Sequence, residues 1–285
     1  MELPRTRDVL PQVIWRESSP STNAELRDLA LDRAGGAEPL PHGTLLATTE
    51  QTAGRGRLGR GWVTPPDMAV AASLLVRGFG QGHGAGQGSG LGPGWLPLIA
   101  GAAMTAALQP YFGDGMRVGL KWPNDVHVRD EDDAMAGRPG LKLVGILCEM
   151  LPDGAIVVGT GVNLLLPEWE LPTERATSLL AAGADVDGAE SLHDAAGQRL
   201  LDDVLADYAT DLLRLIELAG TNPGAVRSRV ARTSVTLGAE VRVHLPAGEV
   251  VDGRARSLAP DGSLVVDLPT GGELTVAAGD VEHLR

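Results

Sequence analysis

Short apolar runs alternate with turn-forming clusters along the first half of the chain, a pattern typical of strands. Residues 45–48 and 68–77 each form such a run, and residues 117–126 are predicted to be a strand that runs into a turn. Residues 142–150 and 155–164 form the clearest pair, because a Pro-Asp-Gly turn separates them. We therefore expect these last two runs to form an antiparallel hairpin inside a central sheet.

Three other segments have helical spacing. Residues 22–34 begin with Thr22 and Glu25 in a capping-box arrangement and end at a Gly-Gly pair. Residues 95–109 are rich in small side chains, which allow close packing on a sheet, and residues 191–218 carry a long apolar stripe. This mixture predicts an α+β fold with a central mixed or antiparallel sheet.

The pattern changes near residue 232. Four short alternating runs follow, separated by Pro-Ala-Gly, Pro-Asp-Gly and Thr-Gly-Gly turns, at residues 234–245, 250–258, 264–268 and 274–277. Such runs are typical of a small all-β barrel. We expect a larger domain at 1–232 and a small barrel-like β domain at 233–285.

Two segments look like surface excursions. Residues 78–94 alternate glycine with small and polar residues, so we expect a flexible insertion in the larger domain. Residues 129–133 are mostly acidic and precede a Gly/Pro-rich stretch, which predicts a solvated loop.

Composition limits the class of protein. The chain has 285 residues, of which 43% are hydrophobic, so it can bury a substantial core. Its formal net charge of −13 disfavours a general nucleic-acid binder. The single cysteine, Cys148, excludes an internal disulfide and fits a reducing compartment. The sequence contains no membrane-spanning run and no signal-peptide pattern, so we expect a cytoplasmic protein without a membrane partner.

Lysine is almost absent. Of the 24 basic residues only Lys121 and Lys142 are lysines. Lysine is a compact charge, whereas arginine is a bulky planar fork. Either these two lysines survive by chance, or they do something that arginine cannot do.

The most unusual stretch is the Gly/Arg loop, residues 54–62, in which three arginines alternate with four glycines before Trp62. Glycines let a backbone approach a ligand closely, and arginines match carboxylate and phosphate oxygens. The loop also contains a Gly-x-Gly-x-x-Gly dinucleotide fingerprint. That fingerprint requires a following helix and an acidic residue about 20 positions later. Two prolines and an apolar strand follow instead, so this reading fails.

Polar residues at other strand ends extend the anion-site hypothesis. Lys121, Asn124 and Asp125 follow one strand, Lys142 begins another, and Asn163 ends a third. Loops at strand ends on a rigid sheet commonly carry function. Asp125 could hold Mg²⁺ or a ribose hydroxyl, but Asn124 and Asp125 could equally form only a turn.

Five motifs in this order resemble the biotin–protein ligases. They are Ser-Thr-Asn at 21–23, Gly-Arg-Gly-Arg-x-Gly-Arg-x-Trp at 54–62, Lys-Trp-Pro-Asn-Asp at 121–125, Lys-Leu-x-Gly-Ile-Leu-x-Glu at 142–149, and Gly-x-Gly-Val-Asn at 159–163. The resemblance runs from about residue 13 to the end of the chain. It implies a class II synthetase-like catalytic domain followed by an SH3-like barrel.

The resemblance also implies a reaction. Biotin would attack the α-phosphate of Mg-ATP to give biotinyl-5′-AMP, and a lysine of a biotin carboxyl carrier protein would then take the biotin. The implied catalytic residues are Lys142 and Arg57. The implied biotin contacts are Ser21, Thr22, Asn23, Gln51, Arg55, Gly56, Arg57 and Lys142. The implied contacts to ATP or the adenylate are Arg57, Arg60, Trp62, Lys121, Asn124, Asp125 and Asn163. The ligands of Mg²⁺ stay open.

The chain departs from the family pattern in several places. Leu58 and Gly61 stand where many members carry basic residues, and both the stretch between Val128 and Lys142 and the insertion at 78–94 are unusual. No winged-helix segment precedes the ligase motifs, so we expect a dedicated ligase without repressor activity or nucleic-acid partner. The competing hypotheses are a lipoate–protein ligase and a non-catalytic biotin sensor.

Overall fold

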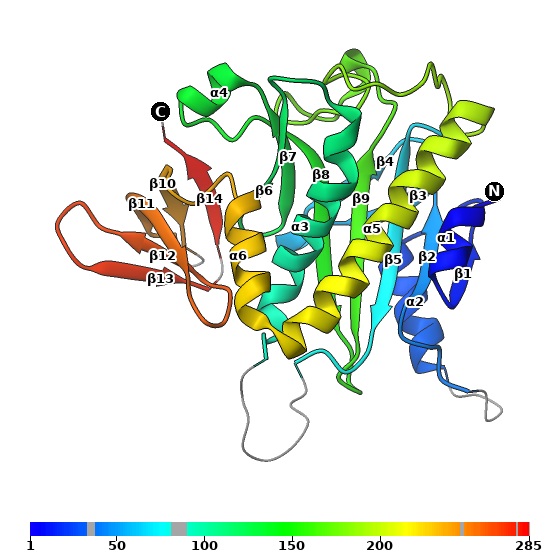
Figure 1. Ribbon diagram of the computed structural model, residues 1–285, viewed down its shortest axis with the longest axis horizontal. Coiled ribbons are helices and arrows are strands. Elements are labelled where there is room, and N and C mark those ends of the chain that lie inside the picture. Colours follow the sequence, from blue (N-terminus) through cyan, green and yellow to red (C-terminus); the bar gives the residue numbers. More distant parts are fainter. Residues whose placement is uncertain (33–37, 81–89, 246–247, 278, 285) are drawn as a thin grey trace.

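A computed structural model describes the whole chain except residues 33–37, 81–89, 246–247, 278 and 285. A mixed seven-stranded sheet forms its centre, in the order β1-β2-β5-β9-β8-β7-β6 (Figure 1). The strands span β1 (Gln12–Trp15), β2 (Thr44–Thr48), β5 (Ala69–Val76), β9 (Ile156–Asn163), β8 (Leu141–Met150), β7 (Asp125–Arg129) and β6 (Arg117–Lys121). Only β1 and β2 pair in parallel within this sheet; the other neighbours are antiparallel.

Helices cover the two faces of the sheet unequally. Along β5 and β9 every residue is buried, which explains why both read as continuous apolar runs. The front face in Figure 1 packs against α3 (Leu96–Leu108) and α5 (Ala195–Thr221) and forms the large core. On the opposite face α2 (Thr22–Leu31) makes a second, smaller cluster that includes Leu26, Leu46 and Val157. Since α2 covers only part of that face, the remainder is left for a cavity.

The C-terminal part of the chain forms a second sheet. Its five antiparallel strands have the order β13-β12-β11-β10-β14. They span β10 (Glu240–His244), β11 (Val250–Leu258), β12 (Leu264–Asp267), β13 (Glu273–Val276) and β14 (Asp280–His283). The helix α6 (Pro223–Thr233) precedes them. Among the described residues β13 and β14 are both edge strands, so the expected barrel is seen as a five-stranded sheet without closure.

The two sheets share one core. Val241, Leu264 and Val281 belong to the same buried cluster as the residues under α3. Two indole N–H groups cross the boundary: Trp95 Nε1 donates to Pro260 O at 2.8 Å, and Trp122 Nε1 donates to Gly262 O at 3.1 Å. The C-terminal sheet is therefore held firmly against the end of the central sheet where β6 lies.

Most of the expected strands and helices are confirmed, with several corrections. A helix that the sequence did not signal, α1 (Pro4–Val9), packs on α5. The first expected helix ends earlier, at Leu31, and its cap is Ser21, whose side chain accepts from Ala24 N at 3.4 Å. Thr22 and Glu25 do not form the capping box, because Glu25 pairs with Arg16 instead.

Other boundaries also move. The long helix begins at Ala195 because Asp194 caps it. The acidic stretch forms a short helix, α4 (Glu131–Met135), rather than a loop. Most of the glycine-rich insertion at 78–94 lies outside the described residues, but Phe79 and Leu91 at its two ends are buried.

A glycine substitution tests the contact between the sheets. A Cβ on Gly94 would lie 2.3 Å from Asp261 O in the C-terminal sheet, whereas a Cβ on nearby Gly92 meets nothing within 4 Å. Gly94→Ala should lower the free energy of unfolding by about 1–3 kcal/mol, because the backbone there must move. Gly92→Ala should change it by less than about 0.5 kcal/mol. Urea unfolding followed by circular dichroism measures both, and equal values would contradict the packing described.

Candidate functional site

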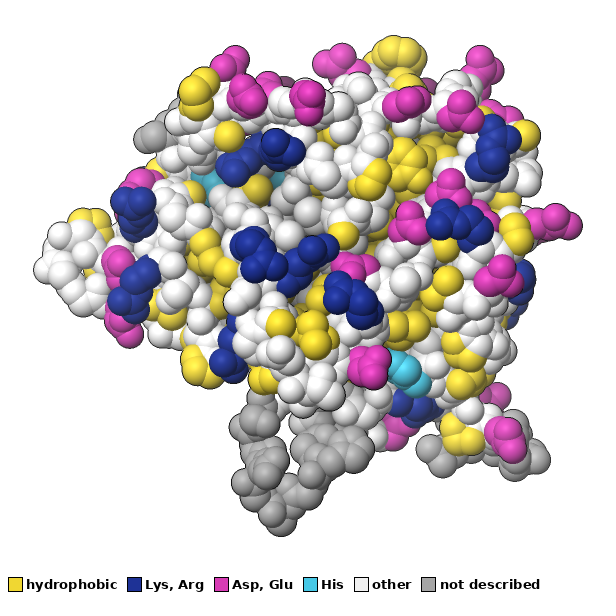
Figure 2. Space-filling view, in the orientation of Figure 1, with side chains coloured by type: hydrophobic (Ala, Val, Ile, Leu, Met, Phe, Trp, Pro, Cys, Tyr) yellow, Lys and Arg dark blue, Asp and Glu magenta, His cyan; other side chains and the backbone are white. Residues whose placement is uncertain are grey.

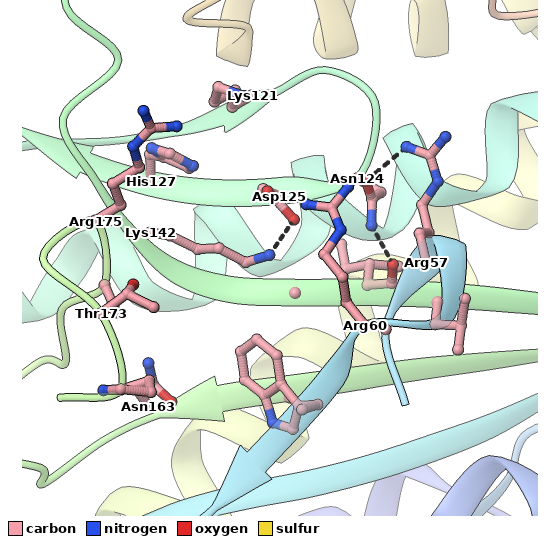
Figure 3. A pocket seen from close by; sticks show the side chains of 18 of the residues that line it. Arg57, Arg60, Lys121, Asn124, Asp125, His127, Lys142, Asn163, Thr173 and Arg175 are labelled. Carbon is pink, nitrogen blue, oxygen red and sulfur yellow. Dashed lines mark hydrogen bonds and ion pairs between the residues drawn. The ribbon is translucent and has the colours of Figure 1, made fainter. Parts of the chain in front are cut away.

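An open cavity of about 920 Å³ lies on the face of the sheet that carries α2. All the residues that the sequence analysis assigned to a site line it. They are Ser21, Thr22, Asn23, Gln51, Arg55, Gly56, Arg57, Arg60, Trp62, Lys121, Asn124, Asp125, Lys142 and Asn163. Figure 3 labels part of this set, including Arg57, Asp125 and Lys142. The structure therefore brings five motifs, far apart in the chain, to one place.

The N-terminus of α2 forms an uncharged end of the cavity. Asn23 is 6% exposed, and its Nδ2 donates to Leu147 O at 3.1 Å and to Glu149 Oε2 at 2.9 Å. A Cβ on Gly159 would lie 2.1 Å from Asn23 Oδ1, so glycine is required there for Asn23 to lie on β9. With both amide hydrogens used inside the protein, Asn23 mainly fixes the position of this end.

Hydrogen counting fixes the polarity of Thr22. Ser73 Oγ lies 2.7 Å from Asn23 Oδ1 and 2.8 Å from Thr22 Oγ1. The amide oxygen can only accept, so the single Ser73 proton points to Asn23. The Thr22 hydroxyl must then donate to Ser73, or to Gln51 Oε1 at 3.3 Å. Thr22 is left with only lone pairs for a ligand, so the group that it meets should carry an N–H or O–H.

The Gly/Arg loop is a small hairpin rather than an irregular loop. β3 (Gln51–Arg55) and β4 (Gly61–Thr64) pair with each other, and Leu58 and Gly59 turn between them at φ of 57° and 74°. Leu58 is 72% exposed and adopts a left-handed conformation that costs energy for such a side chain. This strained, exposed turn is the part of the site best placed to rearrange.

Trp62 forms the floor of the cavity. Its ring lies against two glycines of the central sheet, since a Cβ would come within 2.7 Å of the indole at Gly145 and 2.2 Å at Gly161. The Lys142 amine lies 5.5 Å from the centre of the same ring, within reach of a cation–π interaction. Both glycines belong to the recognised motifs, and their role here is to let the indole lie flat on the sheet.

Four of the five cations predicted from the motifs, all but Arg55, have a partner within the described part of the protein. Lys142 Nζ lies 2.7 Å from Asp125 Oδ1, and Arg57 Nη1 donates to Asn124 Oδ1 at 3.0 Å. Arg60 Nη2 donates to Asp280 Oδ1 at 2.7 Å, and Lys121 Nζ donates to Val281 O at 2.7 Å. The last two contacts come from β14, so the C-terminal sheet is part of the site.

The charges in the site influence one another. Burial lowers the pKa of Arg57, while the carboxylates of Asp280 and Asp125 oppose that shift. Burial also lowers the pKa of Lys121, against the pull of Asp125. Burial disfavours the ionised form of Asp280, but the hydrogen bond and charge of Arg60 outweigh it and bring the pKa of that carboxyl below its usual value. The cavity is thus a cationic site in an acidic protein.

Several lining residues were missed by sequence reasoning. They are Arg138, Thr173, Glu174, Arg175, the strand β14 and His127. Only His127 had a usable signal, since it follows Asp125 by two positions on one strand and so shares its face. Cys148 is unsuited to act as a nucleophile, because burial raises the pKa of its thiol to about 12.

Two histidines at the site give a pH prediction. Burial, together with the charge of Lys121, lowers the pKa of His127 to about 3 and that of His283 to about 4. The unfolded chain takes these protons near pH 6.5 and the folded one does not, so stability is full above 6.5 and falls as the pH drops toward 4. Each histidine should lower the free energy of unfolding by about 2 kcal/mol when the pH falls from about 7 to about 5.

The measurement is the free energy of unfolding at both pH values for the wild type, His283→Gln and His127→Gln. Each variant should lose less stability on acidification than the wild type does. An identical loss in all three proteins would show that the folded histidines bind protons as the unfolded ones do.

No helix in the described part of the chain is long and apolar enough to cross a membrane.

Comparison with known proteins identifies the family. The model of the biotin/lipoate A/B protein ligase family matches residues 17–164, and that of the biotin protein ligase C-terminal domain matches residues 236–284.

Individual relatives agree. A biotin–[acetyl-CoA-carboxylase] ligase from Mycobacterium tuberculosis is 36% identical and is matched over 95% of this chain and 90% of its own length. The bifunctional ligase/repressor BirA of Escherichia coli is 34% identical over 53% of this chain and 40% of its own length. The solved Aquifex aeolicus biotin protein ligase, in complex with biotin and ATP, has a TM-score of 0.65 at 24% identity and covers 97% of this chain and 100% of that one. The chain belongs to the biotin protein ligase family.

Proposed function

We propose that this protein joins biotin to a lysine of a carrier protein in two steps. A biotin carboxylate oxygen attacks the α-phosphorus of ATP, the bond to the β-phosphate bridge breaks, and pyrophosphate leaves. The carrier amine then attacks the carbonyl carbon of biotinyl-5′-AMP, loses a proton, and AMP leaves. The observation that carries the proposal is the position of Lys142 Nζ, a compact cation between an uncharged end and a polycationic end of one cavity.

The register of β8 and β9 gives the order of residues along the cavity. Gly159, under Asn23, pairs with Leu147 on β8, and Gly161 pairs with Gly145 on the same strand. The Lys142 side chain extends back toward Gly145, with Cε 3.4 Å from a Cβ placed there. The amine therefore lies between the α2 end and the part of the cavity near the Lys142 backbone. A ligand with a polar head, an apolar chain and a terminal carboxylate fits this order.

Biotin matches the uncharged end. Its ureido ring offers N–H donors, which suit the lone pairs of Thr22, and a carbonyl oxygen, which suits donors at the start of α2 and on β3. We assign Ser21, Thr22 and Gln51 to this contact, and Arg55, Gly56 and Arg57 of the charged Gly/Arg loop to the rest of the biotin molecule. Asn23 belongs to the same end but positions it, because its amide hydrogens are already used.

Lys142 would bridge the biotin carboxylate and the α-phosphate, exchanging Asp125 for the two ligand anions. Charge builds on the phosphoryl oxygens in the transition state, where a fixed cation stabilises it. Arginine would occupy more space beside Trp62, which explains why lysine is kept at this position in a chain of arginines.

The remaining cations and amides suit the nucleotide. We assign Arg57, Arg60, Trp62, Lys121, Asn124, Asp125 and Asn163 to ATP and the adenylate. Mg²⁺ fits as an ion carried on the phosphates, because it commonly keeps several waters and takes one or two carboxylates. The described residues contain no cluster of three or more metal-binding side chains. A single carboxylate of the cavity wall, such as Asp280, would be enough for an ion that takes only one or two carboxylates. When bound, Mg²⁺ would offset phosphate charge.

The acceptor must be a different chain. Both lysines of this protein are engaged inside the cavity, by Asp125 and by Val281 O. We propose the biotin carboxyl carrier domain of a biotin-dependent carboxylase as the acceptor, and the cytoplasm as the place where it meets ATP. Relatives named as biotin–[acetyl-CoA-carboxylase] ligases support this partner.

Removing the Lys142 amine tests its role. Lys142→Met should reduce biotin-dependent ATP–pyrophosphate exchange by about 10²- to 10³-fold, since one fixed transition-state donor has that worth. The matched control is Arg117→Met, which removes an exposed cation from β6 at the end opposite Lys121. This variant should keep normal exchange. Exchange within threefold of the wild type in a folded Lys142→Met variant would remove Lys142 from the mechanism.

Arg57 should retain the intermediate. Replacing its half-buried guanidinium by an amide, Arg57→Gln, removes charge-assisted hydrogen bonds and should speed biotinyl-AMP release by about 10- to 100-fold. Stopped-flow chase experiments measure the release, and labelling of lysines on a bystander protein reports escaped adenylate.

Leu58→Gly is the control for loop flexibility, because Leu58 already has a φ of 57° that glycine adopts freely. It should leave release within a few-fold of the wild type. If Leu58→Gly and Arg57→Gln release the adenylate equally fast, the guanidinium does not hold the intermediate.

A further inference from the structure

His127 is a wall residue of the cavity that none of the steps above uses. It lies on β7, two positions after Asp125, and both side chains line the cavity (Figure 3). Val126 and Val128 belong to the buried core. The His127 side chain is 6% exposed. A polar ring buried in this way requires partners for both of its nitrogens.

Only one ring nitrogen has a partner. Nδ1 lies 3.1 Å from Gly140 O, and a carbonyl oxygen can only accept, so Nδ1 carries the proton. A neutral ring with that proton has a bare lone pair on Nε2. Among the described residues Nε2 has no hydrogen-bond partner. The two nearby amines have other partners: Lys121 Nζ donates to Val281 O, and Lys142 Nζ pairs with Asp125.

The ring stays neutral in the working pH range. Burial and the charge of Lys121 lower its pKa to about 3. Nε2 is therefore an acceptor at neutral pH and cannot act as a cation toward phosphate.

The chemistry of Nε2 selects its ligand group. Phosphate and carboxylate oxygens carry lone pairs at neutral pH, so they would meet Nε2 with like polarity. The partner must carry an N–H or O–H. In biotin and ATP, the reactants of the first step, these are the ureido N–H groups of biotin, the 6-amino group of adenine and the ribose hydroxyls.

Position separates these choices. The α2 end is opposite Leu147 on β8, whereas His127 pairs with Lys142, five residues further along the same strand. Five residues of strand span about 16 Å. The Lys142 amine extends back from that level toward Gly145, so His127 lies beyond it, on the side away from Thr22. Biotin's ureido ring, placed at the α2 end, cannot reach His127, and the nucleoside can.

We propose that His127 is a nucleotide-binding residue whose unpartnered Nε2 accepts a hydrogen bond from an N–H or O–H donor of the ATP nucleoside. This rests on the proposed function, because the direction of the ligand in the cavity comes from it. Nε2 is covered in the ligand-free protein, so the nucleoside must displace the side chains above it when it binds. The residue then contributes to nucleotide choice: a base with a carbonyl in place of the amine, or a sugar lacking a hydroxyl, leaves Nε2 unpaired.

A cycle of variants and nucleotides tests this pairing. The wild type, His127→Leu and His127→Gln are each assayed for biotin-dependent pyrophosphate release with four nucleotides. These are ATP, purine riboside triphosphate, which lacks the 6-amino group, 2′-deoxy-ATP and 3′-deoxy-ATP. The readouts are kcat/KM for each nucleotide and KM for biotin.

His127→Leu should lower kcat/KM for ATP by roughly three- to tenfold without changing KM for biotin. One of the three analogues should show a similar loss in the wild type and no further loss in His127→Leu, which identifies the donor. His127→Gln, whose amide oxygen can accept, should recover part of the activity toward ATP.

The proposal is overturned if the loss of kcat/KM from His127→Leu multiplies with the loss from every analogue. His127 would then support the fold of the site without contacting any of the groups that the analogues lack. It is also overturned if the wild type uses all three analogues as well as ATP, a result that stands even where His127→Leu fails to fold. Failure of the proposed function looks different: the wild type would then release no pyrophosphate in response to biotin with any nucleotide.

Discussion

The ion pair between Lys142 and Asp125 is the interaction around which the cavity is arranged. An acidic chain must keep several cations close together without a ligand, and it does so by giving Lys142, Arg57, Arg60 and Lys121 an internal partner each. Lys142 extends along β8 to Asp125 on the neighbouring strand, and Trp62 lies beneath its amine. The glycines at 145 and 161 leave room for that indole. A larger residue at either position would push the indole away from the lysine.

The distribution of helices makes room for this arrangement. Because α3 and α5 bury one face of the central sheet, the other face is free beside α2. The C-terminal sheet then closes one side of the cavity, with Asp280 on Arg60 and Val281 O on Lys121. Figure 2, which views the molecule from the helix side, shows basic side chains (dark blue) together with acidic ones (magenta) over that face. On the opposite side, Arg57, Arg60, Lys121 and Lys142 line the cavity.

The motifs in the sequence located the cavity well because each places polar residues at the end of a strand or at the start of a helix, and three of the five, at 54–62, 142–149 and 159–163, also contain glycine. Glycines 145, 159 and 161 are required by close contacts with Trp62 and Asn23, so the letters that identify the motifs are also those that the geometry needs. The C-terminal contribution could not be predicted in this way. Asp280 and Val281 act through a tertiary contact, one of them through a backbone oxygen, and neither leaves a local signal.

The helices and strands also divide into those with a local sequence signal and those that depend on tertiary contacts. The buried strands β5 and β9 were predicted from their continuous apolar runs. The helix α1 was not, because its six residues are too few to show a period, and its position depends on Asp202 of α5, which accepts from Thr6 N at 2.9 Å. Likewise the roles of Thr22 and His127 follow from hydrogen counting around neighbours that the sequence does not place together.

The most direct test of the central claim, that this cavity activates biotin with ATP, is to trap the intermediate. The wild-type protein is mixed with ATP labelled in the α-phosphate and Mg²⁺, together with biotin or with lipoate, and the acid-quenched adenylate is separated and counted. We expect close to one equivalent of biotinyl-AMP per active chain with biotin and none above background with lipoate. No biotin-dependent adenylate, or equal amounts with both acids, would contradict the assignment of the cavity.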